Sequence, residues 1–158
     1  MKIKNGYSVI DIIGISLIFI VLIILTVPLI YKIANNYEYD STRIKATALY
    51  SMAVSEYQND TSLKREITAY CFRADYGYPK TLNDGTIRSI KNTDEGVSYY
   101  ITFDGNGNIT SFVYTDDNYG IDLRENINEI TLSALDKSKF ITKEDAFKII
   151  EKCPYNSN

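Results

Sequence analysis

Asp11 is the residue of this sequence whose position most strongly suggests a chemical role. It lies inside the beginning of a long apolar stretch, and from Ile12 to Tyr31 no side chain carries a charge. An ionised carboxylate within a bilayer costs about 2.5–3.5 kcal/mol on insertion scales, so it needs a partner or a function. Ion pairing with a positive group is the chemistry that such an acid offers. The alternative is that Asp11, which follows Gly6 closely, extends to the aqueous interface.

Two cysteines, Cys71 and Cys153, offer a second kind of chemistry. They could form one disulfide if the domain that carries them lies in an oxidising compartment. That bond would close a loop of about 80 residues and stabilise the fold by at most ~4–5 kcal/mol in the chain-entropy model. Two buried free thiols are the alternative.

The overall composition excludes several classes of function. The 158 residues include 14 tyrosines but no histidine and no tryptophan, which removes most metal and general-base chemistry. The net charge is only −3 with acidic and basic residues interspersed, so no basic stripe points to nucleic acid. The sequence also lacks a nucleophile elbow, a phosphate-binding loop and a cysteine cluster. We therefore expect no enzyme, no cofactor, no metal and no direct nucleic-acid site.

Two acidic segments resemble calcium-binding loops in part. Asp104, Asn106 and Asn108 match the first ligands of an EF-hand loop, but the glycine and the closing acid of such a loop are absent. We expect a hairpin turn there. The second segment contains three aspartates and is expected to be a solvated loop, with a weak calcium site as the alternative; its members are Asp116, Asp117 and Asp122.

The apolar stretch from Ile12 to Tyr31 matches a bilayer in length. At a rise of about 1.5 Å per residue it extends roughly 30 Å. It is apolar all round, whereas a helix on a soluble core would show a polar stripe. The basic leader from Met1 to Gly6 resembles the start of a secretory signal, but the apolar run is too long and no small-residue cleavage site follows it. We expect a retained transmembrane helix over residues 12–31.

Gly6, Asp11 and Pro28 are spaced as in one known family. Residues 2 to about 31 resemble the N-terminus of type IV pilins and pseudopilins. In that family a prepilin peptidase cuts after a glycine behind a short basic leader, an acid stands fifth in the mature chain and a proline twenty-second. Counting from Tyr7 places Asp11 and Pro28 at those two positions. The family usually has Phe first and Glu fifth, so Tyr7 and Asp11 are departures from its pattern.

The resemblance implies a role for each of these residues. Prepilin peptidase would cut between Gly6 and Tyr7 and methylate the new amine of Tyr7, which keeps its positive charge. In a staggered bundle that amine could meet the Asp11 carboxylate of a neighbouring subunit and so set the register. Pro28 removes one backbone N–H and would loosen the helix so that helices pack, although taken alone it would simply bend the chain near the membrane surface.

Beyond the membrane segment the sequence predicts an α+β fold. Apolar residues recur at mostly helical spacing, which predicts an amphipathic helix that continues to about Gln58; they are Ile30, Ile33, Tyr37, Ile44, Ala48 and Met52. We expect this apolar stripe to rest on a sheet, although periodicity alone indicates only the amphipathic helix. The resemblance implies the same pilin-like arrangement, a long N-terminal helix packed on a small antiparallel sheet. We divide the chain into a leader (1–6), the long helix (7–58) and a globular domain (59–158).

Local signals within the domain predict several elements. Residues 97–104 and 109–115 are rich in aromatic and β-branched types and flank a Gly-Asn-Gly turn, which predicts a hairpin. A helix is predicted over 143–152 with Thr142 as its N-cap. A second helix is predicted over 61–72 and a third strand over 86–90. The region 117–140 is left open, since 127–135 could be strand or helix and its spacing fits neither pattern cleanly.

Two functions are consistent with these features. One is a structural subunit of a type IV pilus, competence pseudopilus or type II secretion-like filament, whose partners are prepilin peptidase, other pilin-like subunits and the membrane. The other is an uncleaved, single-pass, signal-anchored protein with an extracytoplasmic binding domain. Both place the chain in the cell membrane with its C-terminal domain outside the cytoplasm, and the first places it in a surface filament as well.

Overall fold

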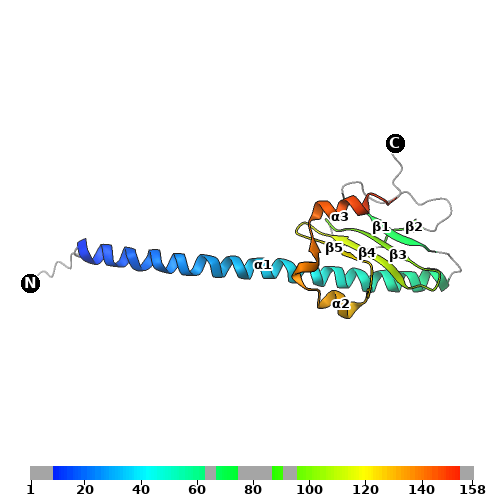
Figure 1. Ribbon diagram of the computed structural model, residues 1–158, viewed down its shortest axis with the longest axis horizontal. Helices are drawn as coiled ribbons and strands as arrows, with labels where there is room; N and C mark the ends of the chain where they lie inside the picture. The colour runs from blue at the N-terminus through cyan, green and yellow to red at the C-terminus, as the bar shows by residue number, and fades with distance from the viewer. Residues whose placement is uncertain (1–8, 63–66, 75–86, 91–95, 154–158) are drawn as a thin grey trace, which may run out of the picture. The chain divides into compact units, whose positions relative to one another are not determined.

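A computed structural model describes residues 9–62, 67–74, 87–90 and 96–153 of the chain. The chain forms two compact units, residues 1–38 and 39–158. The first unit contains the N-terminal part of helix α1 (Val9–Ser62), and the second unit contains the remainder of α1 and all other elements. The expected fold class is confirmed, because the second half of the long helix packs on a mostly antiparallel sheet (Figure 1).

The sheet has six strands in the order β2-β1-β3-β4-β5-β6. All neighbouring strands are antiparallel except β1 and β2, which run parallel. The strand bounds are Ala69–Phe72 for β1, Ile87–Arg88 for β2, Ser98–Phe103 for β3, Ile109–Thr115 for β4, Gly120–Leu123 for β5 and Phe140–Ile141 for β6. The longest strands, β3 and β4, therefore occupy the middle of the sheet, where both faces are covered.

The hairpin prediction is confirmed by β3 and β4. The two strands pair from Ser98 opposite Thr115 to Phe103 opposite Ile109, with an irregularity next to Phe103. Gly107 in the turn has φ +85°, and a Cβ there would lie 2.8 Å from the Tyr57 ring. Both the positive φ and this close approach require glycine.

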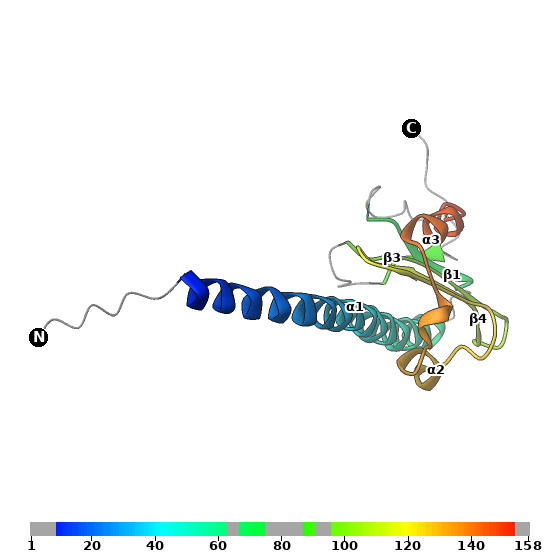
Figure 2. The ribbon, with the colours of Figure 1, turned by 60° about the vertical axis from the view of Figure 1, so that its left-hand side comes forward.

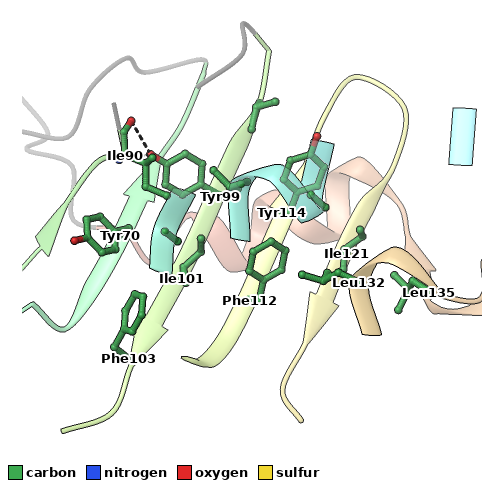
Figure 3. Packing of buried hydrophobic residues seen from close by; sticks show 14 of the residues in the cluster. Tyr70, Ile90, Tyr99, Ile101, Phe103, Phe112, Tyr114, Ile121, Leu132 and Leu135 are labelled. Atoms are coloured by element: carbon green, nitrogen blue, oxygen red, sulfur yellow. Dashed lines mark hydrogen bonds between the residues drawn. The ribbon is translucent and has the colours of Figure 1, made fainter. Parts of the chain in front are cut away.

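Alternation along β3 and β4 sends side chains to opposite faces of the sheet. On one face Tyr99, Ile101 and Phe112 join a core that also contains Leu49 of α1. On the other face Val113 packs with residues of α3. Figure 2 shows α1 and α3 on opposite sides of the sheet, and Figure 3 shows the core side chains between the sheet and α1.

The face of α1 that meets the sheet differs from the face that periodicity predicts. Residues spaced by three or four positions along α1 are 0–2% exposed; they are Thr42, Ala46, Leu49 and Ala53. Ile44, which belongs to the predicted stripe, is 70% exposed. The prediction of the core face is therefore wrong at Ile44, whereas Met52 of the same stripe does pack against the core. The sheet contributes the bulky side chains, so small residues on α1 allow the closest approach.

Two shorter helices complete the domain. Helix α3 (Lys143–Ile150) begins at Thr142, whose Oγ1 accepts a hydrogen bond from the Asp145 amide, so the predicted helix and its N-cap are confirmed. Helix α2 (Glu129–Ser133) resolves the open choice over 127–135 in favour of a helix, with Asn128 as its N-cap. Leu132 of α2 is fully buried in the core beside α1.

The prediction of a second helix over residues 61–72 is wrong, because residues 61–62 are the end of α1, residues 63–66 lie outside the described residues, and no helix follows at 67–72. Ala69–Phe72 is strand β1, paired with β3 and β2. Its residues are buried on both faces, since Tyr70 enters the core under α1 and Cys71 is bonded to Cys153 beyond α3. A short strand covered on both sides has no alternating pattern, and periodicity does not separate it from a helical segment.

Candidate functional site

The apolar part of α1 is the first candidate, and it lies in the N-terminal unit. Its large side chains are exposed all round the helix; those of Leu17, Phe19, Ile24 and Leu29 are 58–65% exposed. By length and composition this is a helix able to cross a membrane, within the part of the chain that the structure describes. Such a surface requires an apolar surrounding, either lipid or other helices.

Two hydroxyl groups in this segment are satisfied within the helix. Ser16 Oγ donates to the carbonyl of Ile12 and Thr26 Oγ1 to that of Leu22, each at 2.8 Å. Hydroxyl groups bonded in this way present no free donor to hydrocarbon. The polar residues of the stretch are therefore compatible with a membrane.

The residues expected to act in processing and assembly fall in different parts of the chain. Gly6 and Tyr7 lie outside the described residues. Asp11 lies on α1, and its side chain is outside the described part. Pro28 lies inside α1, where its missing amide hydrogen leaves the carbonyl four residues earlier, that of Ile24, without its usual donor.

A buried carboxylate joins the start of the packed half of α1 to the β4–β5 loop. Asp116 is 2% exposed, and its Oδ2 accepts hydrogen bonds from Thr42 Oγ1 at 2.9 Å and from Tyr114 Oη at 3.3 Å. Its Oδ1 accepts from the amides of Asn118 and Tyr119 at 2.8 and 3.1 Å. Four hydrogen-bond donors offset the desolvation of this carboxylate. Its bonds link α1 to the β4–β5 loop, and we call this contact the Asp116 latch.

A second buried carboxylate holds the end of α1. Asp60 accepts a hydrogen bond from Tyr70 Oη on β1 at 2.8 Å and pairs with Arg88 of β2 at 3.1 Å. Burial, followed by the hydrogen bond to Asp60, raises the pKa of the Tyr70 hydroxyl above its ordinary value, so it remains a proton donor. The packed half of α1 is thus fixed to the sheet near both of its ends.

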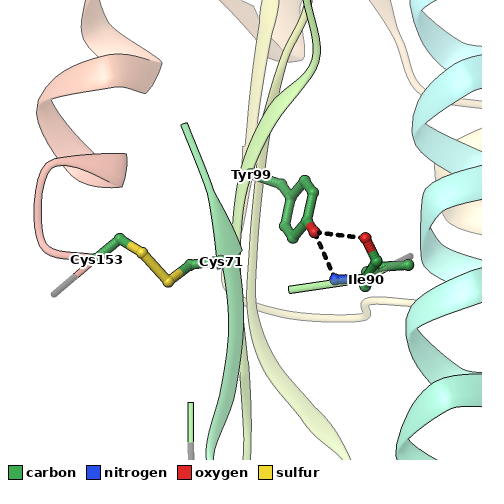
Figure 4. The surroundings of a disulfide bond; sticks show 4 residues. All are labelled: Cys71, Ile90, Tyr99 and Cys153. Carbon is green, nitrogen blue, oxygen red and sulfur yellow. Dashed lines mark hydrogen bonds between the residues drawn. A yellow bond between two sulfur atoms is a disulfide. The ribbon is translucent and has the colours of Figure 1, made fainter. Parts of the chain in front are cut away.

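The disulfide prediction is confirmed. Cys71 of β1 and Cys153, which follows α3, are bonded with their Cα atoms 5.9 Å apart (Figure 4). Both residues are buried. The bond ties the C-terminal end of the described chain to an interior strand, on the face opposite α1.

The side chains of both acidic segments make contacts within the domain. The expectation of a solvated loop for the second segment is wrong, because Asp116 is buried and Asp122 lies on strand β5. Asp104 accepts hydrogen bonds from the amides of Asn106 and Asn108, and the Asn108 side chain, followed by these amides, lowers the pKa of the Asp104 carboxyl. Asp117 pairs with Lys143, and Asp122 pairs with Arg124. Among the described residues no three His, Cys, Asp or Glu side chains gather closely enough to hold a metal ion.

Two open hollows lie on the second unit. One, of about 450 Å³, combines a stacked Tyr39–Tyr119 pair, with ring centroids 4.2 Å apart, and Phe140 with charged residues at the start of α3. The other, of about 340 Å³, is a groove between α1 and α2. Sequence reasoning missed both hollows and the Asp116 latch, because their residues come from segments far apart in the chain.

Comparison of the chain with models of protein families, with curated proteins and with solved structures finds no match. The architecture itself is pilin-like. It combines a long N-terminal helix, apolar in its first half and packed on an antiparallel sheet in its second, with one disulfide in the sheet domain.

Proposed function

We propose that the chain is a pilin-like structural subunit of a type IV pilus, a competence pseudopilus or a type II secretion-like filament. The observation that carries the proposal is that one helix, α1, supplies both an exposed apolar segment and the element that a disulfide-bonded α+β domain packs against. The spacing of Gly6, Asp11 and Pro28 in the sequence supports the same conclusion.

In this proposal prepilin peptidase cuts after Gly6 and methylates the amine of Tyr7. The chain is held in the cell membrane by α1, with its domain outside the cytoplasm, where the Cys71–Cys153 bond can form. The positive amine of one subunit pairs with Asp11 of its neighbour, which removes an unpaired carboxylate from hydrocarbon. Pro28 frees one carbonyl of α1 and gives the helix local freedom to pack.

The hydrogen-bonded carboxylates Asp116 and Asp60 would keep α1 attached to the sheet domain in a filament. Lateral packing of α1 in a filament transmits load from the apolar segment to the domain. Hydrogen bonds at both ends of the packed half, together with the buried face of Ala46, Leu49 and Ala53, oppose separation of the helix from the sheet. The domain then follows α1 into the assembly.

Asp11 gives the direct assembly test. In cells that carry the peptidase and assembly machinery, Asp11→Ala should lower incorporation into filaments by about tenfold or more, because the amine loses its partner. Asp11→Glu keeps the charge and should restore incorporation, and Ile15→Val serves as a control in the same segment. Full incorporation of the Asp11→Ala chain would contradict the proposal.

The second candidate is an uncleaved, signal-anchored protein whose domain binds a ligand as a monomer. The aromatic hollow beside Tyr39, Tyr119 and Phe140 is the observation in its favour. A cysteine at position 33 separates the two functions. Thiol crosslinking of Ile33→Cys copies in the membrane yields dimers if α1 helices pack side by side and yields none if the protein is a monomer.

A further inference from the structure

Two tyrosines of the second unit pack on each other outside both hydrophobic cores. Tyr39 of α1 and Tyr119 of the β4–β5 loop are stacked, with ring centroids 4.2 Å apart and an angle of 14° between the rings. The ring of Phe140 on β6 lies nearly perpendicular to both tyrosines, at centroid distances of 5.0 and 5.9 Å. Neither tyrosine belongs to the core between α1 and the sheet or to the core beside α3. The three rings form an aromatic wall of the larger hollow, whose volume is about 450 Å³.

Most of the other side chains that line this hollow are polar. Lys143 Nζ, at the start of α3, lies 3.0 Å from Asp117 Oδ1 and ties the helix to the β4–β5 loop. The backbone amide of Asn118 donates to Asp116, which fixes the same loop. In the described part of the chain, the side chains of Asn118 and Glu144 take part in no hydrogen bond or ion pair. An amide and a carboxylate are therefore available to a ligand beside the aromatic wall.

The charges around the aromatic wall disfavour a charged ligand. Lys137 Nζ lies 5.0 Å from the ring centroid of Tyr39, and the Arg43 guanidinium lies 5.9 Å from that of Phe140. Because cations of the chain itself already face these rings, a cationic ligand would gain little from them. An anionic ligand would meet the Glu144 carboxylate and lysines that already have partners. A neutral ligand that combines polar groups with an apolar face matches the hollow best.

We propose that this hollow binds a neutral carbohydrate, with a pyranose ring against the aromatic wall. The C–H groups on one face of a sugar carry partial positive charge and suit the negative face of an aromatic ring. The sugar hydroxyls then reach the Asn118 amide and the Glu144 carboxylate. A hollow of about 450 Å³ that combines aromatic rings with a few polar groups is typical of small-molecule sites. All of its residues lie in the second unit, so the site does not depend on assembly of α1 into a filament.

Saturation-transfer NMR on the full-length chain tests the inference. The detergent must have no sugar head group, because a glycoside detergent would compete for the hollow. The probes are neutral trisaccharides of glucose, galactose, mannose and N-acetylglucosamine, with tetramethylammonium and inorganic phosphate as charged comparisons. We expect at least one trisaccharide to bind. Binding of a charged comparison alone, or of no probe at all, would overturn the inference.

Two sources offer this sugar chemistry, the glycan of the cell's own envelope and saccharides from outside the cell. Stronger binding of the N-acetylglucosamine trisaccharide would support the inference and point to the envelope glycan. Stronger binding of one of the hexose trisaccharides would support it and point to an external saccharide. Neither result depends on filament assembly, so this test and the Asp11→Ala test of the proposed function can fail separately.

Substitutions locate the binding in the hollow. Tyr39→Ala removes one ring of the stacked pair and should weaken trisaccharide binding by about tenfold or more. Tyr37→Ala is the matched control and should bind as wild type does, since Tyr37 is 74% exposed on the same helix and does not line the hollow. Equal binding by these two variants would overturn the inference.

Asn118→Ala separates binding from stability. Its backbone amide still donates to Asp116 and its side chain is exposed, so the unfolding midpoint should stay at the wild-type value. Trisaccharide binding should weaken by about threefold or more, because the sugar loses a hydrogen-bond partner. Wild-type affinity in this variant would contradict the proposed site.

Discussion

Replacing Cys71 and Cys153 together by alanine removes the covalent link between strand β1 and the segment after α3. The two residues are 82 positions apart in the sequence, so the bond closes most of the domain into one loop. In the chain-entropy model, the free energy of unfolding then falls by about 4.5 kcal/mol. A domain of this size has a stability of roughly 5–15 kcal/mol, so the variant should lie close to its folding threshold.

Urea unfolding of the full-length chain in mild detergent measures this loss. Tyrosine fluorescence reports on the domain, since the sequence contains no tryptophan. With a slope of about 1–2 kcal/mol per molar urea, the midpoint should move down by roughly 2.3–4.5 M. Wild-type protein unfolded with a reductant is the matched control, because its thiols keep the volume that alanine removes at two buried positions.

The same experiment can refute the reasoning. A decrease below about 1 kcal/mol, in both the variant and the reduced wild type, would mean that the bond does not restrict the unfolded chain as its loop length requires. A large decrease in the variant alone would instead assign the effect to lost packing around Cys71 and Cys153. Agreement between the variant and the reduced protein is the predicted result.

Three further predictions concern the contacts that shape the domain. Gly120→Ala should lower the free energy of unfolding by about 1–3 kcal/mol, because the added Cβ would lie 2.6 Å from that of Ala146; urea unfolding measures this, and Gly105→Ala should be neutral. Asp116→Asn should cost about 1–3 kcal/mol in the same assay, since an amide cannot accept at both positions that face Thr42 and the β4–β5 loop amides; an unchanged midpoint would remove the latch from the account. The pKa of Asp104 is lowered in the fold, so the stabilisation from its carboxylate is present above its unfolded pKa and is lost as pH falls through its folded pKa. The difference in unfolding free energy between wild type and Asp104→Ala should therefore be largest near neutral pH and shrink in acid. A difference that does not change with pH would contradict this reasoning.

Local chemistry in the sequence predicted some elements well. The hairpin of β3 and β4 follows from two aromatic and β-branched runs that flank a turn requiring glycine at 107. Helix α3 follows from Thr142, whose side chain accepts a hydrogen bond from the free amide of Asp145 in the first turn. The first part of the long helix follows from a segment that is apolar all round and long enough to cross a bilayer. In each case the signal lies within one short stretch of chain.

Other parts of the fold depend on partners distant in the sequence. Strand β1 is buried by α1 on one face and by the disulfide on the other, so its own residues carry no strand pattern. The edge strand β6 has only two residues and exists because β5 pairs with it. The aromatic side chains of the sheet fill the space beneath α1, so the helix face with the small residues Ala46 and Ala53 lies against the sheet and Ile44 does not. Periodicity within α1 contains none of this information.

The candidate functional residues also fall into those visible in the sequence and those visible only in the folded domain. The spacing of Gly6, Asp11 and Pro28 is visible in the sequence and leads to the assembly proposal. The Asp116 latch and the α1–α2 groove became visible only in the folded domain, because each joins α1 to residues more than 70 positions away. Ile44 combines both kinds of evidence, since the sequence identifies it as part of an apolar stripe and the fold shows that the sheet leaves it exposed.

The mass of the mature N-terminal peptide tests the central claim most directly. Intact-mass and peptide mass spectrometry of the chain from cells with active prepilin peptidase should show a protein that begins at Tyr7 and carries one added methyl group. The same cells without the peptidase should yield the chain with its leader attached. A chain that still begins at Met1 in the presence of the active peptidase would contradict the account.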